Sequence, residues 1–314
     1  MRALLYGEWL KLRRQRMLYV VLVVLFVLTV AIGAYQVVQE PPSVSGDWRQ
    51  SLTKQIEQLE KKQQELSPGT IMYDVNRERI ILYRYQLEHD IPPDPESNVW
   101  DFLSSTSYLM TLAGFYLIAM SVYIVASEYQ QGTIKFLFLK PTPPLSVMIA
   151  KWLTITGLLA GITVYILVLS WLVGAVLFGV SGPTETLVVT GDEVIVQHAA
   201  LSELRRYALS AIGIWIMCSG AFALACVIRS VAVATAVSLL FYYSGELVTG
   251  LLAARFDWIK YVLFANTNLN VYFEGRPPVE GMSLTFSIIL LFVYMLLFAA
   301  LVFRSVHKKD VPLS

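Results

Sequence analysis

Six apolar runs, each at least 22 residues long, constrain the fold of this chain more than any other feature. About 20 consecutive apolar residues in a helix are enough to cross the hydrocarbon core of a bilayer. Backbone polar groups in lipid need internal partners, and the alternating pattern of a β-barrel is absent, so we predict helices. The predicted spans cover residues 17–38, 102–126, 147–180, 207–228, 231–254 and 282–303.

The distribution of charge indicates the orientation of these spans. An even number of spans puts both termini on one side, with residues 304–314 as a tail. That side carries 12 of the 24 basic residues but only three acids, Glu8, Glu128 and Asp310. The opposite side carries 19 acids. Because an excess of Lys and Arg marks the cytoplasmic side, we predict a multi-pass protein of the cell membrane with both termini in the cytoplasm. We expect this membrane to be bacterial.

Residues 1–16 are rich in arginine and precede the first span. Leu5, Trp9 and Leu12 follow helical spacing, which predicts a helix lying on the cytoplasmic membrane surface. A signal peptide is the alternative, because a basic start followed by an apolar run is typical of one. The run from residue 17 to 38 is longer than a usual signal core, so we expect it to remain as the first span.

Residues 39–101 form the only sizeable polar region. Asp47 has the character of an N-cap, and apolar residues then recur at helical spacing up to a break at Ser67-Pro68-Gly69. A second helical stretch follows at about 71–89. We predict an extracellular helical hairpin, acting either as a passive spacer or in gating or substrate recognition. Two helices of this length bury little alone, so we expect the hairpin to pack on a partner copy or on the spans.

The loop at residues 127–146 has a pattern of its own. Glu128 stands near its start, Gly132 and Thr133 follow, and an apolar run at 134–139 precedes a cluster of prolines. Proline ends a helix because it lacks the backbone donor. The apolar run needs a cover, which is either a lipid surface, as for an interfacial helix, or another protein subunit.

This pattern resembles the permease subunits of ABC-2 type ABC transporters. The shared features are a Glu, three residues, Gly-Thr, an apolar run, Lys-Pro, and a Lys that enters the next span. The residues that carry the resemblance are Glu128, Gly132, Thr133, Leu137, Lys140, Pro141 and Lys151.

In that family the first cytoplasmic loop is a coupling helix that sits in a groove of the ATPase subunit. The resemblance implies an all-α integral membrane fold with six transmembrane helices of ABC-2 type. An N-terminal interfacial helix fits this family, whereas the long extracellular hairpin departs from its compact pattern. Contacts with the ATPase subunit are expected from Glu128, Gly132, Thr133, Lys135, Phe136, Phe138, Lys140 and Pro141.

Two further segments lie between the later spans. Residues 181–206 are predicted to be an extracellular loop. Residues 255–281 mix charge with aromatic side chains, as expected at a membrane interface. This segment resembles the short re-entrant helices between the fifth and sixth spans of the ABC-2 fold. An ordinary extracellular loop with interfacial aromatics is the alternative.

Polar chemistry inside the spans is sparse. Gly157 and Gly161 form a small-xxx-small pair, which favours close helix packing. Glu246 is the one acid well inside a predicted span and is a candidate pathway or structural acid. We expect it to cap nearby backbone or to pair with Arg255, rather than to bind substrate or a proton.

The chain lacks several chemical signatures. It has no phosphate-binding loop, no paired intramembrane acids and no His or Cys spacing typical of a metal site. We therefore expect no enzyme activity, no metal or cofactor in this chain, and no nucleic-acid partner. ATP and Mg would be bound by a partner ATPase subunit.

The leading hypothesis is a permease for an ATP-driven exporter of an amphipathic peptide, lipid or drug-like molecule. Its partners in the complex would be two ATPase subunits and either a second permease copy or a sister permease. A membrane sensor or scaffold with a ligand-binding hairpin is one alternative. A secondary carrier using Glu246 is the other.

Overall fold

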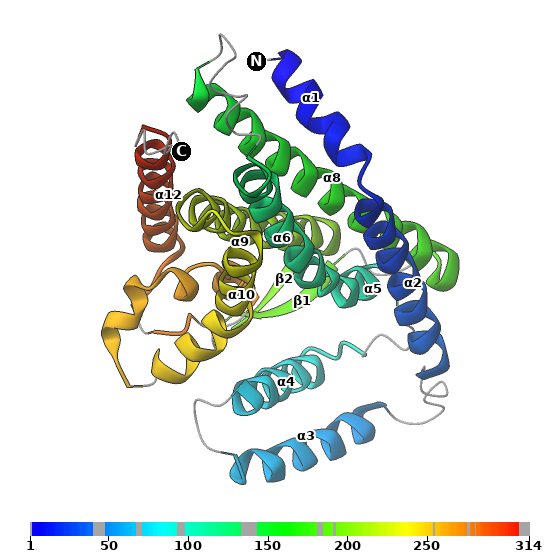
Figure 1. The fold of residues 1–314 in the computed structure, drawn as a ribbon. Helices are drawn as coiled ribbons and strands as arrows, with labels where there is room; N and C mark the ends of the chain where they lie inside the picture. The colour runs from blue at the N-terminus through cyan, green and yellow to red at the C-terminus, as the bar shows by residue number, and fades with distance from the viewer. Residues whose placement is uncertain are drawn as a thin grey trace.

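The fold is that of a mostly helical chain with a small β-hairpin (Figure 1). It is taken from a computed structural model that describes residues 2–39, 48–66, 71–92, 98–132, 143–180, 185–190, 193–253, 255–274, 277–279 and 281–307.

The described residues contain six helical segments that are long and apolar enough to cross a membrane. The predicted class, a largely helical multi-pass membrane protein, is therefore confirmed. The elements that form the six segments are α2 (Arg16–Gln39), α5 (Val99–Thr106) with α6 (Leu109–Gln130), α8 (Pro144–Phe178), α9 (Ala199–Ile228), α10 (Val231–Ala253) and α12 (Leu284–His307).

The second span begins earlier than its hydropathy suggests. Helix α5 starts at Val99 because Asn98 caps it: Oδ1 of Asn98 accepts hydrogen bonds from the backbone N–H of Trp100 at 2.8 Å and of Asp101 at 3.0 Å. The Asp101 carboxylate in turn accepts from the Asn98 N–H at 3.5 Å, which completes a capping box. Helix α6 continues the span after a short break.

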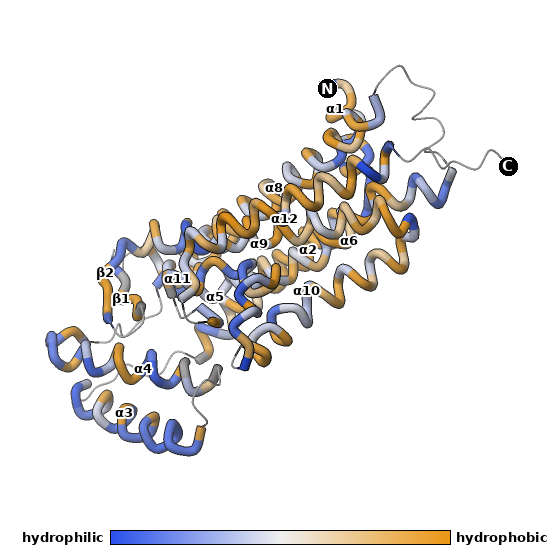
Figure 2. Tube along the Cα trace, turned by 90° about the vertical axis from the view of Figure 1, so that its left-hand side faces the viewer, coloured by the Kyte–Doolittle hydropathy of each residue, from blue (hydrophilic) through white to orange (hydrophobic). Residues whose placement is uncertain are grey.

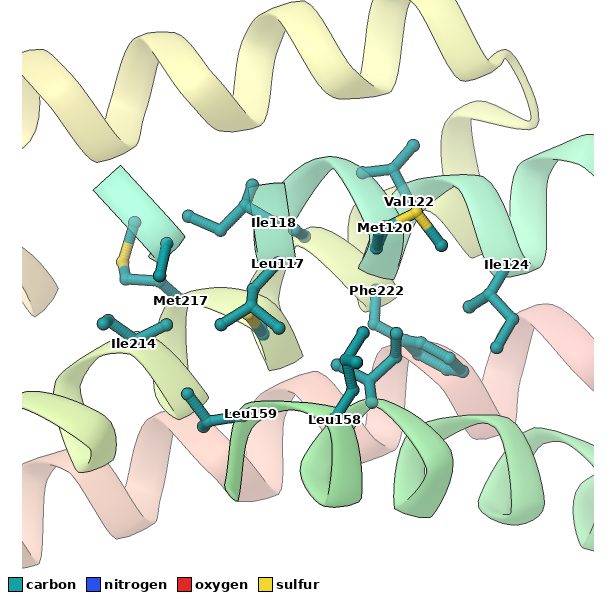
Figure 3. Packing of buried hydrophobic residues seen from close by; sticks show 14 of the residues in the cluster. Leu117, Ile118, Met120, Val122, Ile124, Leu158, Leu159, Ile214, Met217 and Phe222 are labelled. Carbon is teal, nitrogen blue, oxygen red and sulfur yellow. The ribbon is translucent and has the colours of Figure 1, made fainter. Parts of the chain in front are cut away.

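Helices α6 and α9 form the centre of the bundle. In their most apolar 18-residue windows, 72% and 67% of the residues are buried, against 17–22% in the other four segments. Their side chains interleave with those of α8; Leu117 and Ile118 of α6, Leu158 of α8 and Phe222 of α9 lie together in this core (Figure 3). The other helices surround this pair and keep exposed apolar faces.

Two ends of the molecule can be distinguished. Helix α1 (Arg2–Arg13) and the end of α12 lie at one end, called here the terminal end (Figures 1 and 2). Helices α3 (Trp48–Gln64) and α4 (Ile71–Glu88) pack on each other at the opposite, distal end. They are more hydrophilic than the bundle (Figure 2). The predicted N-cap Asp47 lies outside the described residues.

A β-hairpin stands where the sequence predicted only a loop. Strand β1 (Glu185–Thr190) pairs antiparallel with β2 (Glu193–His198), with Glu185 opposite His198. Both strands are rich in β-branched residues, which favour a pleated strand. Helix α9 follows directly and begins at Ala199, eight residues before the predicted start of the span. Ser202 and Glu203 are buried there although they are polar, so hydropathy alone missed this first part of the helix.

Short helices occupy the segment before the last span: η1 (Asp257–Tyr261), η2 (Leu263–Ala265) and α11 (Val271–Glu274). The fully buried Asn266 holds this segment together. Its amide donates to the carbonyls of Lys260 at 2.8 Å and Val262 at 2.9 Å, and its Oδ1 accepts from Ser287 of α12 at 2.6 Å. All its polar atoms thus have partners, which is what makes a buried amide stabilising.

Candidate functional site

Lys151 lies at the centre of a buried ion-pair network at the terminal end. Lys151 is fully buried, with 0% of its surface exposed, and its ammonium group has three N–H donors. These reach Oε1 of Glu128 at 2.7 Å, Oε2 of Glu8 at 3.0 Å and the carbonyl of Ile124 at 3.0 Å. Every donor therefore has an acceptor, which compensates for the cost of removing the charge from water.

Lys11 completes the network from its exposed side. Its ammonium lies 2.7 Å from Oε1 of Glu8 and 3.2 Å from Oε1 of Glu128. Two cations and two anions are thus in direct contact, and the group is neutral as a whole. We call Glu8, Lys11, Glu128 and Lys151 the charge cluster.

The pKa values of the two α1 residues reflect this arrangement. Burial by itself would raise the pKa of Glu8, but the charge of Lys151 and the hydrogen bonds from Lys11 and Lys151 outweigh it and lower the pKa below 4.5. Burial would likewise lower the pKa of Lys11, but Glu8 and Glu128 raise it above 10.5. Each shift favours the charged form, as expected for groups with opposite charges beside them.

Three helices supply the cluster. Glu8 lies on α1 one turn before the buried Leu12, so the face that packs on α8 also carries the acid. Glu128 lies in the last turn of α6, one turn after Ile124, which aligns its carboxylate with that carbonyl. Lys151 lies in the third turn of α8. The cluster therefore ties α1 to both helices that border the loop at residues 127–146.

Gly132 ends α6 just after the cluster. Its φ is +67°, in the left-handed region that glycine adopts without steric cost. The helix is closed there by hydrogen bonds from the Gln131 N–H to the Ser127 carbonyl at 3.0 Å and from the Gly132 N–H to the Tyr129 carbonyl at 3.2 Å. Tyr129 also lies under the guanidinium of Arg229 at the end of α9, 5.2 Å from ring centroid to Cζ.

The other residues expected to contact an ATPase lie outside the described part of the chain. They are Thr133, Lys135, Phe136, Phe138, Lys140 and Pro141. Within the described part, the two ends of the sequence motif, Glu128 and Lys151, are brought into contact.

Sequence reasoning missed Glu8 and Lys11. The helical spacing placed Leu5, Trp9 and Leu12 on one face of a helix at the membrane surface. Within the chain Leu12 is buried and Trp9 is 45% exposed, and Glu8 is buried together with Leu12. Glu8 is the only acid among residues 1–16, and it lies four residues before Leu12. Residues four apart share a helix face, so this spacing could have indicated that Glu8 is buried together with Leu12.

Two candidate features lie inside the spans. Gly157 and Gly161 lie on α8, and no atom within the described chain comes within 4 Å of a Cβ placed at either one. The expected role in helix packing therefore stays a prediction, for a helix that does not belong to the described residues. Glu246 on α10 accepts a hydrogen bond from Nδ2 of Asn268 at 3.0 Å, and among the described residues it forms no ion pair with Arg255.

The fold and this site define a class: a multi-pass helical membrane protein whose helix ends are joined by a buried ion-pair network. No group of three or more His, Cys, Asp or Glu in the described residues could hold a metal ion. The chain belongs to the family described as "Protein of unknown function (DUF2705)", whose profile matches residues 69–312.

Two relatives come from Bacillus subtilis (strain 168). The chain is 30% identical over 313 residues to "Uncharacterized protein YhcI", an alignment that covers 98% of both chains. It is 28% identical over 219 residues to "Uncharacterized membrane protein YdbK", covering 69% of this chain and 85% of that relative.

Proposed function

We propose that this chain is the permease subunit of an ATP-driven transporter of ABC-2 type. Separate ATPase subunits would dock on the loop at residues 127–146. The observation that carries the proposal is the buried contact of Lys151 with Glu128 and Glu8, because it fixes both borders of that loop to each other and to α1. A loop that only rested on lipid would have no need of so rigid a base.

The proposed mechanism is mechanical. ATP would close the pair of ATPase subunits and displace the loop. Since the charge cluster joins the ends of α6 and α8, the displacement would move both helices together with α1. Helix α6 packs along α9 in the core, so the movement would reach the distal end of the bundle. Packed helices transmit such shifts because their interfaces do not deform continuously.

The remaining parts of the complex follow from this role. ATP and Mg would be bound by two ATPase subunits, and a second permease copy or a sister permease would complete the pathway. The low charge of the spans supports export of an amphipathic peptide, lipid or drug-like molecule. The basic residues of the terminal end support a cytoplasmic position for both termini, and the Bacillus relatives support a bacterial cell membrane.

A coupling experiment tests the proposal. The complex is purified from its native membrane, its ATPase subunits are quantified, and its transport-linked ATPase activity is measured in lipid. We expect two ATPase subunits per pair of permeases, and we expect Glu128→Ala to reduce coupled activity at least tenfold in complexes that still assemble. Arg84→Gln is the matched control, because Arg84 forms an exposed ion pair with Glu60 on the hairpin. Unchanged coupling in Glu128→Ala would refute the docking role.

A secondary carrier is the second candidate, favoured by one observation: Glu246 lines a cavity among the spans. An acid at such a position can take up a proton during transport. This function requires uptake driven by an ion gradient without an ATPase partner, and its loss in Glu246→Gln.

A further inference from the structure

A cavity of about 420 Å³ lies at the distal end between α6, α9, α10 and the segment that follows η2. Met110, Ile214, Met217 and Phe264 supply apolar surface to it. Arg206, Glu246, Asn268 and several hydroxyl groups supply polar surface. Its volume and mixed lining are typical of a site for a drug-sized ligand.

Close backbone contacts hold the walls of this cavity in place. A Cβ on Gly213 of α9 would come within 2.4 Å of the Thr267 carbonyl oxygen, and one on Gly245 of α10 within 2.4 Å of the Phe264 ring. Helix η2 is thus pressed against α10, and the segment that follows it is pressed against α9. The Tyr242 hydroxyl of α10 donates to the Thr111 carbonyl of α6 at 3.2 Å and links the remaining wall. The cavity is therefore formed before any ligand enters.

The two charged residues of the cavity have different surroundings. Arg206 lies 3.3 Å from the carboxylate of Glu203, and it also donates to the Ser104 hydroxyl. The charge of Arg206 is therefore matched within the chain. Glu246 instead accepts from the neutral amide of Asn268, and the described residues give it no cation. A carboxylate held in this way keeps its attraction for a positively charged ligand.

A second cavity of about 370 Å³ continues from the first toward the helical hairpin. Ser104 and Arg206 line both cavities, so their contact forms the wall between them. Three acids and two arginines line this second space. They are Glu78, Arg79, Asp101, Glu203 and Arg206.

We propose that the first cavity binds an amphipathic cation. The ammonium or other cationic centre of the ligand lies beside Glu246, and its apolar body contacts Met217 and Phe264. An amphipathic anion would fit less well, because it would compete with Glu203 for Arg206 and would be repelled by Glu246. The binding site stands on the cavity alone; the statement that its ligand is the transported substrate rests on the proposed function.

A pair of ions with nearly the same shape and opposite charge tests the site. Tetraphenylphosphonium and tetraphenylborate are titrated into the purified chain in nanodiscs of phosphatidylcholine, without ATP, and binding to empty nanodiscs is subtracted. We expect saturable binding of the cation, a Kd at least tenfold higher in Glu246→Gln, and retained affinity in Glu246→Asp. Met217→Trp fills the cavity without changing its charge, and it is expected to weaken binding as well.

Glu60→Gln is the control, since Glu60 lies on the exposed hairpin outside both cavities. Size-exclusion profiles and melting curves verify that each variant is folded. Equal affinity of parent and Glu246→Gln, equal binding of both ions, or no saturable cation binding would overturn the site. Because no ATPase takes part, cation binding without an ATPase partner would refute the proposed function alone. Coupled ATPase activity without cation binding would refute the site alone.

Discussion

The Nζ atom of Lys151 lies 2.7 Å from Oε1 of Glu128, a contact between residues 23 positions apart in the chain. It joins the last turn of α6 to the beginning of α8, although the segment between these helices contains an apolar run and two prolines, Pro141 and Pro143. The two helix ends that border the loop are therefore held together, and α1 is tied to them through Glu8.

Replacing the buried cation tests the strength of this connection. Lys151→Met keeps the length of the side chain but removes the buried cation that contacts both Glu8 and Glu128. We expect a loss of about 3–5 kcal/mol in stability, the usual range when one partner of a buried ion pair is removed. Thermal unfolding in detergent measures the loss. Lys11→Met is the control; its side chain is 61% exposed, so about 1 kcal/mol or less is expected. Equal melting temperatures for the two variants would contradict the structure.

Docking of α1 should depend on pH at both extremes. The pKa of Glu8 is lowered from 4.5, so its contribution is present above that value and is lost as the pH falls through the folded-state pKa. The pKa of Lys11 is raised from 10.5, so its contribution is present below that value and is lost as the pH rises through the folded-state pKa. Between these limits both contributions are constant.

A spin label on α1 measures this dependence. Tyr6 is 66% exposed, so a label at Tyr6→Cys reports the motion of α1 without entering the interface, provided that Cys218 and Cys226 are replaced by Ala. We expect constant mobility at neutral pH and a rise in mobility below pH 4.5. Glu8→Gln should remove the transition on the acid side. A transition at the same pH in that variant would assign it to another group.

The two kinds of glycine in the spans should respond in opposite ways to alanine. In Gly213→Ala the new Cβ would lie 2.4 Å from the Thr267 carbonyl oxygen, so we expect a loss of about 1–3 kcal/mol from overpacking. Gly157 faces open space on α8, so Gly157→Ala should leave stability unchanged or raise it by up to about 1 kcal/mol through helix propensity. Melting curves of both variants in the same detergent decide the matter; an unchanged melting temperature in Gly213→Ala would refute the close contact.

Gly132 should be limited by its backbone and not by space. A Cβ there would have no neighbour within 4 Å, but φ is +67°. We expect Gly132→Ala to lower the free energy of unfolding by about 1–2 kcal/mol and to reduce coupled ATPase activity. Gly132→Asn should retain most of the activity, because Asn adopts the left-handed region more readily than Ala. Equal activity of all three proteins would mean that this end of α6 has no part in coupling.

The six membrane segments could be predicted from the sequence because the bilayer imposes length and apolarity on each. The ends of the segments could not. Asn98 starts α5 through a cap, and the buried polar residues at the start of α9 are stabilised by neighbours from other parts of the chain. Hydropathy measures neither effect. The β-hairpin was missed for a related reason, since its two short strands lie within a region that was expected to be a polar loop.

The site was predicted in part. The resemblance to ABC-2 permeases placed Glu128 and Lys151 in one motif. Their partners Glu8 and Lys11 lie more than 110 residues away from Glu128 and could be found only in three dimensions. The pattern of Gly157 and Gly161 favoured helix packing but could not say which helix is the partner, and no described residue of this chain comes close to either glycine.

Because the spans are buried to different extents, they should differ in which substitutions they tolerate. Positions on α6 and α9 meet protein on most sides, so a substitution there must preserve volume as well as apolarity. Many side chains on α2, α10 and α12 lie on the outer surface of the protein, so a substitution at these positions need only remain apolar. A saturation mutagenesis map would accordingly show two narrow bands of intolerance, at residues 109–130 and 199–228, between broad stretches where Leu, Ile, Val and Phe interchange freely.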